Sequence, residues 1–393
     1  MQRNPDAGSH LAYVRFLAEK QALPGPGDCS VCHHPPLYYA AAALVSLAFG
    51  SGRALQLLSL VALGGFGLLA ARCFARLFAR PAQQALATAL VVLWPLGVIA
   101  SARVNNDVAF YLVAAACFYF LLRWWQTPET RWLGLAAGAA ALGLFVKANA
   151  LVLVLLVLAV VLLRTARRGG SGRSQWLLAG ALVMVAALHG FFRAGAGGAL
   201  SHRVLGTAYK TAPGELDPRG AGYYTRFEPR SFVRVPYAEA AIPRGLEPTF
   251  WNHWLKSSLH GTRTRVFAFL AAPEPPAARR VAQTLNALLL ALLAFGIAGA
   301  WLSRRFAGPY RELLAVSAGV WVAAAVAFHA LVPTGHHADF RFVFPVLIPA
   351  SALYVDITYG LRRRGLWLWH AGYLLVELFV AFSLAYVLAL RVS

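Results

Sequence analysis

Long apolar segments alternate with short polar ones along most of the chain. Ten of them approach the roughly 20 apolar residues that a helix needs to cross a bilayer, and the fourth and fifth are short enough to form one broken hairpin. The predicted spans are residues 54–78, 82–101, 107–125, 132–147, 149–163, 175–192, 281–302, 312–331, 342–360 and 366–390. The pattern therefore predicts an all-α fold, a polytopic bundle of transmembrane helices.

Three further segments predict helices at the membrane surface. Residues 4–20 form an amphipathic helix, because their apolar positions recur on one face. Residues 37–49 are apolar, but about 13 residues are too few for a full crossing, which favours a re-entrant or interfacial piece. Residues 250–259 mix aromatic and polar positions and predict a second interfacial helix.

The order of these elements predicts four regions. An external first loop with surface and re-entrant helices covers residues 1–53, and transmembrane helices cover 54–192. A long external loop covers 193–280, and C-terminal transmembrane helices cover 281–393. No signal peptide or span precedes the polar first loop. Either a first helix is missing before Met1 or the first span inserts in reverse, and we favour the missing helix.

Composition agrees with a membrane protein, and charge gives its orientation. Hydrophobic residues make up 59% of the chain and charged residues 13%, which is more apolar surface than a soluble domain can bury. The net charge of +21 does not indicate nucleic-acid binding, because the cations lie mostly between apolar segments or in the long loop. Arginines gather at alternate ends of consecutive spans, which predicts that those ends are cytoplasmic. The first and long loops are then external, and we expect a multi-pass protein of a bacterial plasma membrane.

Acidic residues are scarce, 15 in the chain, so those on the predicted external face are candidates for chemistry. Asp6 begins the first surface helix, and His10 follows it on the same face. Asp107 follows Asn106 at a span entrance, and Asp339 lies in the segment HHADFR. Each of these carboxylates can instead cap a helix or remain a solvated loop charge.

Two cations interrupt apolar sequence near the same face. Lys147 lies within GLFVKANALV, and Arg341 lies within DFRFVFPVLIP. A cation at this depth needs an anionic partner, and a lipid phosphate is the natural one at a bilayer surface. The simpler alternative is snorkelling toward ordinary headgroups. Arg103 shows a weaker form of the same pattern.

The first loop contains the segment CSVCH, formed by Cys29, Cys32 and His33. This spacing matches the attachment site of a c-type haem, and with His33 or His34 it is also compatible with a metal site. A simple disulfide or free thiols is the interpretation we favour. The chain has no Walker loop, nucleophile elbow or zincin motif, so nucleotide hydrolysis, serine hydrolysis and zincin chemistry have no support.

Six segments occur in an order that resembles a known family. They are PDAGSHLAYVRFLAEKQALP, HHPPLYY, SARVNNDVAFYL, GLFVKANALV, FWNHWLKSSLHG and DFRFVFPVLIP. Together they resemble the membrane glycosyltransferases of the C-type fold, which use polyprenyl-phosphate sugars. Protein O-mannosyltransferases and the aminoarabinose transferases of lipid A are relatives of this type.

The resemblance implies roles for residues at matching positions. Asp6 matches the first-loop acid that acts as general base, and Asp107 matches a second external acid that shapes the site. The entrance motif is matched by His34, Pro35 and Tyr38. Lys147 and Arg341 match cations that contact the lipid phosphate. His10 and Asn106 are further candidates for substrate binding. Relatives often have Asp-Glu where this chain has Asp6–Ala7, so we expect no certain cofactor, although a divalent metal stays open.

The expected activity is transfer of a hexosyl or pentosyl group from a polyprenyl-phosphate donor to a hydroxyl of a glycan, lipid or protein acceptor. Direct displacement at the external membrane face would invert the anomeric carbon. Aromatic residues of the long loop can stack on the sugar or simply anchor the loop at the interface. The other partners expected are membrane lipids, and nucleic acid is not expected.

Hypotheses from other classes stay open. A transporter or flippase of a lipid-linked sugar predicts charges aligned through the membrane, which only Asp356 and Glu377 suggest. A structural ion pair is the simpler interpretation of both, for Asp356 with Arg362 or Arg363. A scaffold or a haem-bearing membrane subunit is a further alternative.

Overall fold

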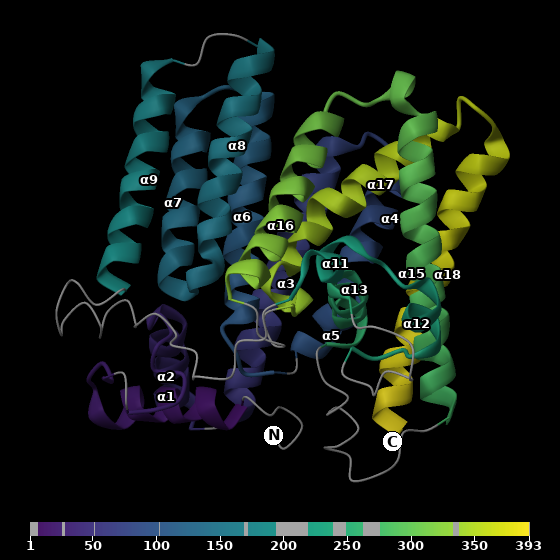
Figure 1. Ribbon diagram of the computed structural model, residues 1–393. Helices are drawn as coiled ribbons and strands as arrows, with labels where there is room; N and C mark the ends of the chain where they lie inside the picture. The colour runs from purple at the N-terminus through teal and green to yellow at the C-terminus, as the bar shows by residue number, and fades with distance from the viewer. Residues whose placement is uncertain are drawn as a thin grey trace. The chain divides into compact units, whose positions relative to one another are not determined.

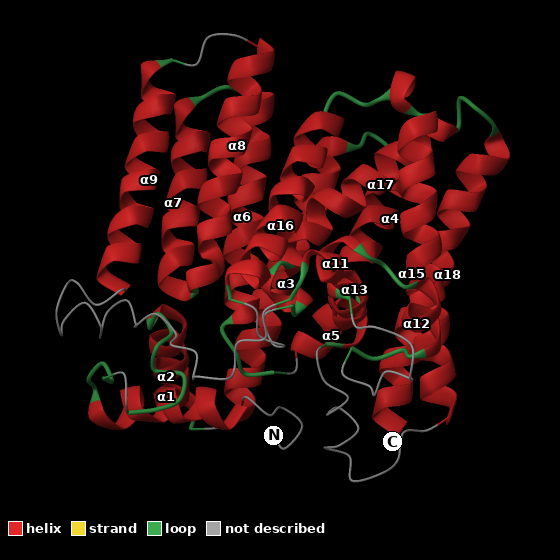
Figure 2. Ribbon diagram, in the orientation of Figure 1, coloured by secondary structure: helices red, strands yellow, loops and turns green. Residues whose placement is uncertain are grey.

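The computed structural model is helical throughout the part of the chain that it describes. This part comprises residues 7–25, 28–50, 52–101, 103–168, 172–193, 219–238, 249–261, 276–332 and 338–392. No strand occurs within these ranges (Figures 1 and 2). The all-α prediction is therefore confirmed.

Two compact units divide the chain, Met1–Cys73 with Ala100–Thr211 and Phe74–Ile99 with Ala212–Ser393. Unit 1 holds α1 (Ala7–Lys20), α2 (Leu37–Phe49), most of α3 (Gly52–Leu77), α6 (Asp107–Gln126), α7 (Thr130–Val146), the 3₁₀ turn η1 (Ala148–Ala150), α8 (Leu151–Arg168) and α9 (Arg173–Arg193). In this unit α7 packs against α6, α8 and α9, and α1 packs against α2. Both α1 and α2 lie at the end of the unit where α7 and α9 finish (Figure 1).

Unit 2 combines long helices with several short ones. It holds α4 (Pro81–Val92), most of α5 (Pro95–Ser101), α11 (Ala221–Thr225), α12 (Pro229–Arg234), α13 (Phe250–His260), α15 (Pro276–Leu302), η2 (Arg304–Phe306), α16 (Arg311–Leu331), η3 (Phe340–Phe342), η4 (Phe344–Val346), α17 (Leu347–Leu361) and α18 (Leu366–Val392). Helix α15 packs against α17 and α18, and α17 also packs against α4 and α16. The short helices α12 and α13 pack on α15, and α13 also contacts η3.

Most predicted spans form single long helices. Among the described residues, eight helices are long and apolar enough to cross a membrane, and the bent pair α4 and α5 makes a ninth. The chain is an integral, multi-pass membrane protein. Helix α7 is apolar but shorter, at 17 residues. The four membrane regions predicted from the sequence stay a prediction.

The second predicted span, residues 82–101, is not one straight helix. Helices α4 and α5 meet at an angle of 58°. Pro95 lacks an N–H group, and its ring disfavours a helical conformation of the residue before it, Trp94. The Trp94 indole N–H then donates to the carbonyl of Ser258 at 2.6 Å, which fixes the bend.

The fourth and fifth predicted spans form two helices, α7 and α8, joined by Lys147 and η1. Gly143 permits their close approach, because a Cβ atom there would lie 2.9 Å from the Ala150 side chain. The surface elements also form helices. Helix α2 ends at Gly50, whose φ of 62° is typical of a left-handed cap, and α13 confirms the helix predicted at 250–259.

Candidate functional site

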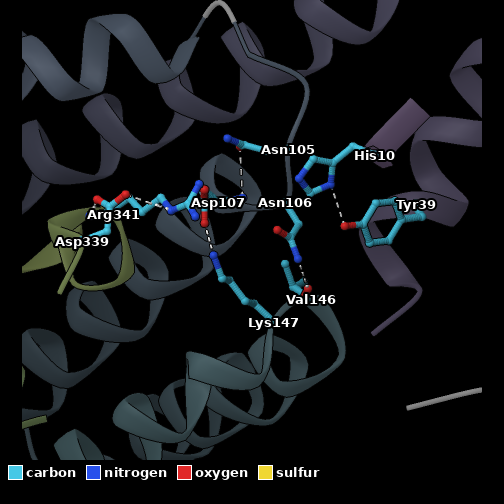
Figure 3. Close-up of polar contacts among 9 residues, drawn as sticks. All are labelled: His10, Tyr39, Asn105, Asn106, Asp107, Val146, Lys147, Asp339 and Arg341. Carbon is cyan, nitrogen blue, oxygen red and sulfur yellow. Dashed lines mark hydrogen bonds and ion pairs between the residues drawn. The ribbon is translucent and has the colours of Figure 1, made fainter. Parts of the chain in front are cut away.

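The start of α6 and the end of α7 carry a buried ion pair. Asp107 is the first residue of α6, and Lys147 is the first residue after α7. The Lys147 ammonium donates to Oδ1 of Asp107, and the two side chains are only 6% and 4% exposed (Figure 3). Burial makes each charge dependent on its partner, because neither is well solvated.

Two asparagines hold this junction in place (Figure 3). The Asn106 amide donates to the Val146 carbonyl at 3.2 Å, so the start of α6 satisfies a main-chain acceptor at the end of α7. The Asn105 side-chain oxygen accepts a hydrogen bond from the Asp107 N–H at 3.2 Å. Asn106 therefore has a structural contact here, and its predicted contact with substrate stays a prediction.

Helices α1 and α2 bring together a second polar pair. Nδ1 of His10 lies 2.8 Å from the Tyr39 hydroxyl (Figure 3). The ring of Tyr13, one turn after His10 on α1, stacks on Tyr39 with centroids 4.0 Å apart. Tyr39 and Tyr13 are 0% and 1% exposed, so this contact is part of the packing between the two helices.

The connection between α1 and α2 is closed by a disulfide between Cys29 and Cys32. Of the alternatives for CSVCH, the structure has the disulfide, which leaves neither thiol available for a haem thioether. The ring of His33 lies 4.3 Å from that of His34, and its Nδ1 donates to the Ser30 carbonyl at 3.1 Å. Burial lowers the pKa of His33, and this disulfide turn therefore presents a neutral imidazole at physiological pH.

Electrostatic interactions join these pieces into one site at one end of unit 1. Burial holds the pKa of His34 well below its usual value, and the nearby cations Lys147 and Arg193 act in the same direction. Burial also raises the pKa of Tyr38 to about 12, with a smaller contribution from Asp107. The site thus combines a carboxylate, two cations and neutral ring donors and acceptors.

The structure brings together most of the predicted site residues. His10, His34, Tyr38, Asn106, Asp107 and Lys147 all lie at this end of unit 1. The predicted base Asp6 lies outside the described residues. Arg341 belongs to unit 2, where its guanidinium lies 3.1 Å from the carboxylate of Asp339. Asp339 also caps η3 by accepting from the Arg341 N–H at 2.9 Å, which is the capping alternative considered from the sequence.

One predicted ion pair has a different partner. The Asp356 carboxylate accepts from Nε of Arg311 at 2.6 Å, rather than from Arg362 or Arg363. Arg311 is the first residue of α16, which packs along α17 and so reaches Asp356 before the arginines beyond the end of α17. The structural ion pair expected for Asp356 is thus present, with Arg311 as its cation.

The sequence missed two residues of the site in unit 1. Tyr39 adjoins Tyr38 in HHPPLYY, but its partner His10 is 29 residues away in sequence. Arg193 ends α9 on the face predicted to be poor in cations. A cation on that face was the sequence feature that could have identified Arg193 as a site residue. No group of three or more His, Cys, Asp or Glu side chains suited to a metal ion occurs in the described part of the chain.

Comparison with known proteins bears on the same region. The family model described as dolichyl-phosphate-mannose-protein mannosyltransferase matches residues 33–190. This match supports a relationship between that segment and the polyprenyl-phosphate-sugar glycosyltransferases. The matched segment begins at His33 and includes the Asp107–Lys147 pair. No curated protein and no solved structure matches the chain.

Proposed function

We propose that this chain transfers a sugar from a polyprenyl-phosphate donor to an acceptor hydroxyl at the external face of the membrane. The observation that carries the proposal is the buried Asp107–Lys147 pair, which lies within the segment matched by the mannosyltransferase family model. A buried cation beside neutral imidazoles suits a phosphate leaving group. The hexosyl or pentosyl nature of the sugar and the identity of the acceptor are left to experiment.

The reaction needs a base and a positive counter-charge. The acceptor oxygen attacks the anomeric carbon while the bond from that carbon to the phosphate oxygen breaks, and the hydroxyl proton passes to a carboxylate. Asp6, which precedes the first residue of α1 in sequence, is our proposed base. Lys147 stabilises the charge that develops on the departing lipid phosphate, and Arg341 is proposed to share this task. A single displacement inverts the anomeric configuration.

Asp107 has a different role in this proposal. Its carboxylate holds the Lys147 ammonium at the start of α6, and the neighbouring asparagines fix the backbone of both residues. Because a fixed charge need not reorganise during the reaction, a preorganised lysine stabilises the transition state more than a mobile one. His10, His34 and Tyr38 are proposed to line the substrate site around this pair.

Release of polyprenyl phosphate from a panel of polyprenyl-phosphate sugars tests the proposal. We expect wild-type membranes to release the lipid from at least one donor, and we expect Asp6→Asn and Asp107→Asn to lower the rate by about 10²-fold or more. Glu129→Gln is the matched control, because Glu129 pairs with Arg131 on an exposed surface. Wild-type-like release by Asp6→Asn would remove Asp6 as base. A product of retained configuration would exclude the single displacement.

The transporter hypothesis is tested by the same donors in sealed vesicles. A flippase would move the lipid-linked sugar between leaflets without releasing polyprenyl phosphate. The Arg311–Asp356 pair accounts for one of the two span carboxylates on which that hypothesis rests.

A further inference from the structure

The short helix α12 packs against α15 and brings two pairs of arginines together (Figure 1). The Gln283 amide of α15 donates to the Arg234 carbonyl at 3.0 Å, so the end of α12 lies beside the first turns of α15. The arginines at this contact are Arg230 and Arg234 from α12 and Arg279 and Arg280 from α15.

All four arginines lie on the outside of unit 2. Arg230 and Arg234 are four residues apart, which places them on one face of α12, and both are exposed. Other residues of α12 are buried. Arg279 and Arg280 are also exposed, and they lie about one turn before Gln283, which contacts the end of α12. The four side chains are therefore within a few helical turns of one another.

The apolar part of α15 indicates the level of these arginines in a bilayer. Trp301 is exposed near the other end of α15, and the guanidinium carbon of Arg304 lies 5.5 Å from its ring centroid. Tryptophan with arginine is typical of a headgroup layer. Arg280 precedes Trp301 by 21 residues, a helical rise of about 32 Å, and the hydrocarbon core of a bilayer is about 30 Å thick. Arg280 is thus expected at the opposite headgroup layer, which the sequence predicts to be external.

The same helix indicates that this arginine cluster faces lipid. Ile297 is 74% exposed within the apolar stretch of α15, so it marks the side of the helix that faces the hydrocarbon. Arg279 precedes Ile297 by 18 residues, which is five turns at 3.6 residues per turn. Both residues therefore lie on one face, and Arg279 is at the headgroup end of the lipid-facing side.

Carboxylates do not balance this positive charge within the described parts of α11, α12, α13 and α15. These segments contain one acidic residue, Glu228. Its carboxylate accepts from the main-chain N–H of Arg230 at 3.2 Å and so caps α12. A cluster of basic residues at headgroup level attracts anionic lipids, and each arginine near the surface adds to the affinity.

We propose that Arg230, Arg234, Arg279 and Arg280 bind the phosphates of anionic phospholipid headgroups. A guanidinium group suits this ligand, because it can donate two parallel hydrogen bonds to phosphate oxygens. Bound headgroups bridge α12 and α15 and hold the segment from α11 to α13 at the membrane surface. This site is separate from the proposed sugar transfer and does not depend on it.

Photoreactive lipids test the proposal in vesicles. The full chain is reconstituted in phosphatidylcholine with a small fraction of phosphatidylglycerol that carries a photoreactive group close to its headgroup. Phosphatidylcholine with the same group is the reference probe, and peptide mass spectrometry counts the adducts of each probe on residues 219–238 and 276–286. We expect the anionic probe to give about fivefold more adducts or better in wild type, and a smaller excess at high salt.

Substitutions of the arginines test the role of their charge. The combined change to glutamine should bring the ratio of the two probes near one, and the variant carries Arg230→Gln, Arg234→Gln, Arg279→Gln and Arg280→Gln. Each pair of these substitutions alone should give an intermediate ratio. The corresponding change of all four to lysine should keep most of the excess, because it keeps the charge. The main-chain bonds at Arg230 and Arg234 do not need these side chains, so thermal midpoints should stay near that of wild type.

Arg304→Gln combined with Arg305→Gln is the matched control. These two exposed arginines follow the other end of α15, so the control removes charge at the opposite headgroup layer. It should leave the adducts on residues 219–238 and 276–286 unchanged. An equal loss in this control would show that only the net charge of the protein matters, and it would overturn the proposal.

Two further results would contradict a phospholipid site. Equal adducts from the two probes in wild type, or an excess that survives the four glutamine substitutions, would remove the arginines as its ligands. Polyprenyl phosphate added in the same amount as phosphatidylglycerol should leave most adducts in place. Complete displacement would assign the arginines to the polyprenyl lipid instead. None of these measurements needs turnover, so their outcome is independent of the proposed glycosyltransferase activity.

Discussion

Two groups of buried polar side chains, one at the candidate site of unit 1 and one in unit 2, differ in their partners. At the site in unit 1, two buried pairs join side chain to side chain, Asp107 with Lys147 and His10 with Tyr39. In unit 2 the buried groups between α12, α13 and α15 bond mainly to main-chain carbonyls. Asn286 donates to the carbonyls of Phe232 and Pro236 at 2.8 and 3.0 Å.

The two buried lysines show the contrast most directly. Lys147 in unit 1 is buried and has a carboxylate partner. Lys256 in unit 2 is 4% exposed, and its ammonium donates to the Ser231 carbonyl at 3.1 Å near the Phe232 ring. Burial lowers the pKa of Lys256 to about 8. A buried lysine is therefore a candidate for chemistry where a carboxylate stabilises its charge. A buried lysine that donates to a main-chain carbonyl instead satisfies a hydrogen-bond acceptor in an irregular segment.

Replacing each lysine by methionine should produce the largest difference between the units. Lys147→Met is expected to lower polyprenyl phosphate release by about 10²–10³-fold, because a preorganised charge at the leaving group is lost. Polyprenyl phosphate release by Lys256→Met is expected to stay within about twofold of wild type per folded molecule. Lys256 donates to the Ser231 main-chain carbonyl, and it is not proposed to contact the reacting groups. The assay is the donor panel, corrected for folded protein.

Loss of Lys147 leaves Asp107 buried without its cation, which can unfold the chain. The double variant Lys147→Met with Asp107→Asn removes both charges and keeps the shape of the second side chain. We expect it to recover thermal stability and not activity. Recovery of both would show that the pair is structural only.

Asn286→Leu should have the next largest effect, on stability. The substitution removes donors from two buried carbonyls and the acceptor of His260 Nε2, and we expect the folded state to lose about 2–4 kcal/mol. Gln283→Leu on the same helix is the control, because Gln283 makes one exposed bond to the Arg234 carbonyl and should cost below about 1 kcal/mol. Thermal midpoints in detergent compare the two. Equal midpoints would contradict the anchoring role of Asn286.

The disulfide in unit 1 gives a smaller expected effect. Cys29→Ser combined with Cys32→Ser should lower stability by about 2 kcal/mol, the loop-entropy value for so short a closure. Treatment of wild type with dithiothreitol should produce the same fall in the thermal midpoint. The thermal midpoint of the serine variant should not change with dithiothreitol. A fall in that midpoint would show that the reductant acts at a site other than this disulfide.

The pH dependence of Lys256 tests the comparison through stability alone. The folded state holds its proton only to a pKa of about 8, below the usual value of 10.5, so the unfolded state binds more protons between these values. Stability of wild type should therefore rise with pH from about 8 toward 10.5, and the full penalty is present below pH 8. Lys256→Met should be more stable than wild type at pH 7, with the advantage shrinking at higher pH. Parallel stability curves for the two proteins would contradict this assignment.

Helix positions were largely predictable from the sequence, because runs of apolar residues fix where a span lies. The bend between α4 and α5 was not predicted, although Pro95 lies in the apolar segment. The length of an apolar segment does not show where a proline removes a backbone N–H and interrupts the helix. Asp107 and Lys147 were each predicted on one face. Their pairing was not, because it depends on how α6 and α7 pack.

Contacts between side chains distant in sequence account for the remaining misses. Tyr39 meets His10 only because α1 and α2 pack together, and nothing in HHPPLYY distinguishes its two tyrosines. Asp356 pairs with Arg311, which is 45 residues away, in place of arginines that are nearer in sequence. Proximity along the chain favoured the wrong partner, whereas helix packing decided the observed one.

The ion pair between α6 and α7 also bears on membrane insertion. Asp107 and Lys147 are 40 residues apart on consecutive helices, so they meet as soon as these two helices fold against each other. A carboxylate and an ammonium group that meet at this stage neutralise each other, which lowers the free energy of moving them toward the bilayer. Helices α6 and α7 can thus enter the membrane with this ion pair already formed, before any other contact of the site.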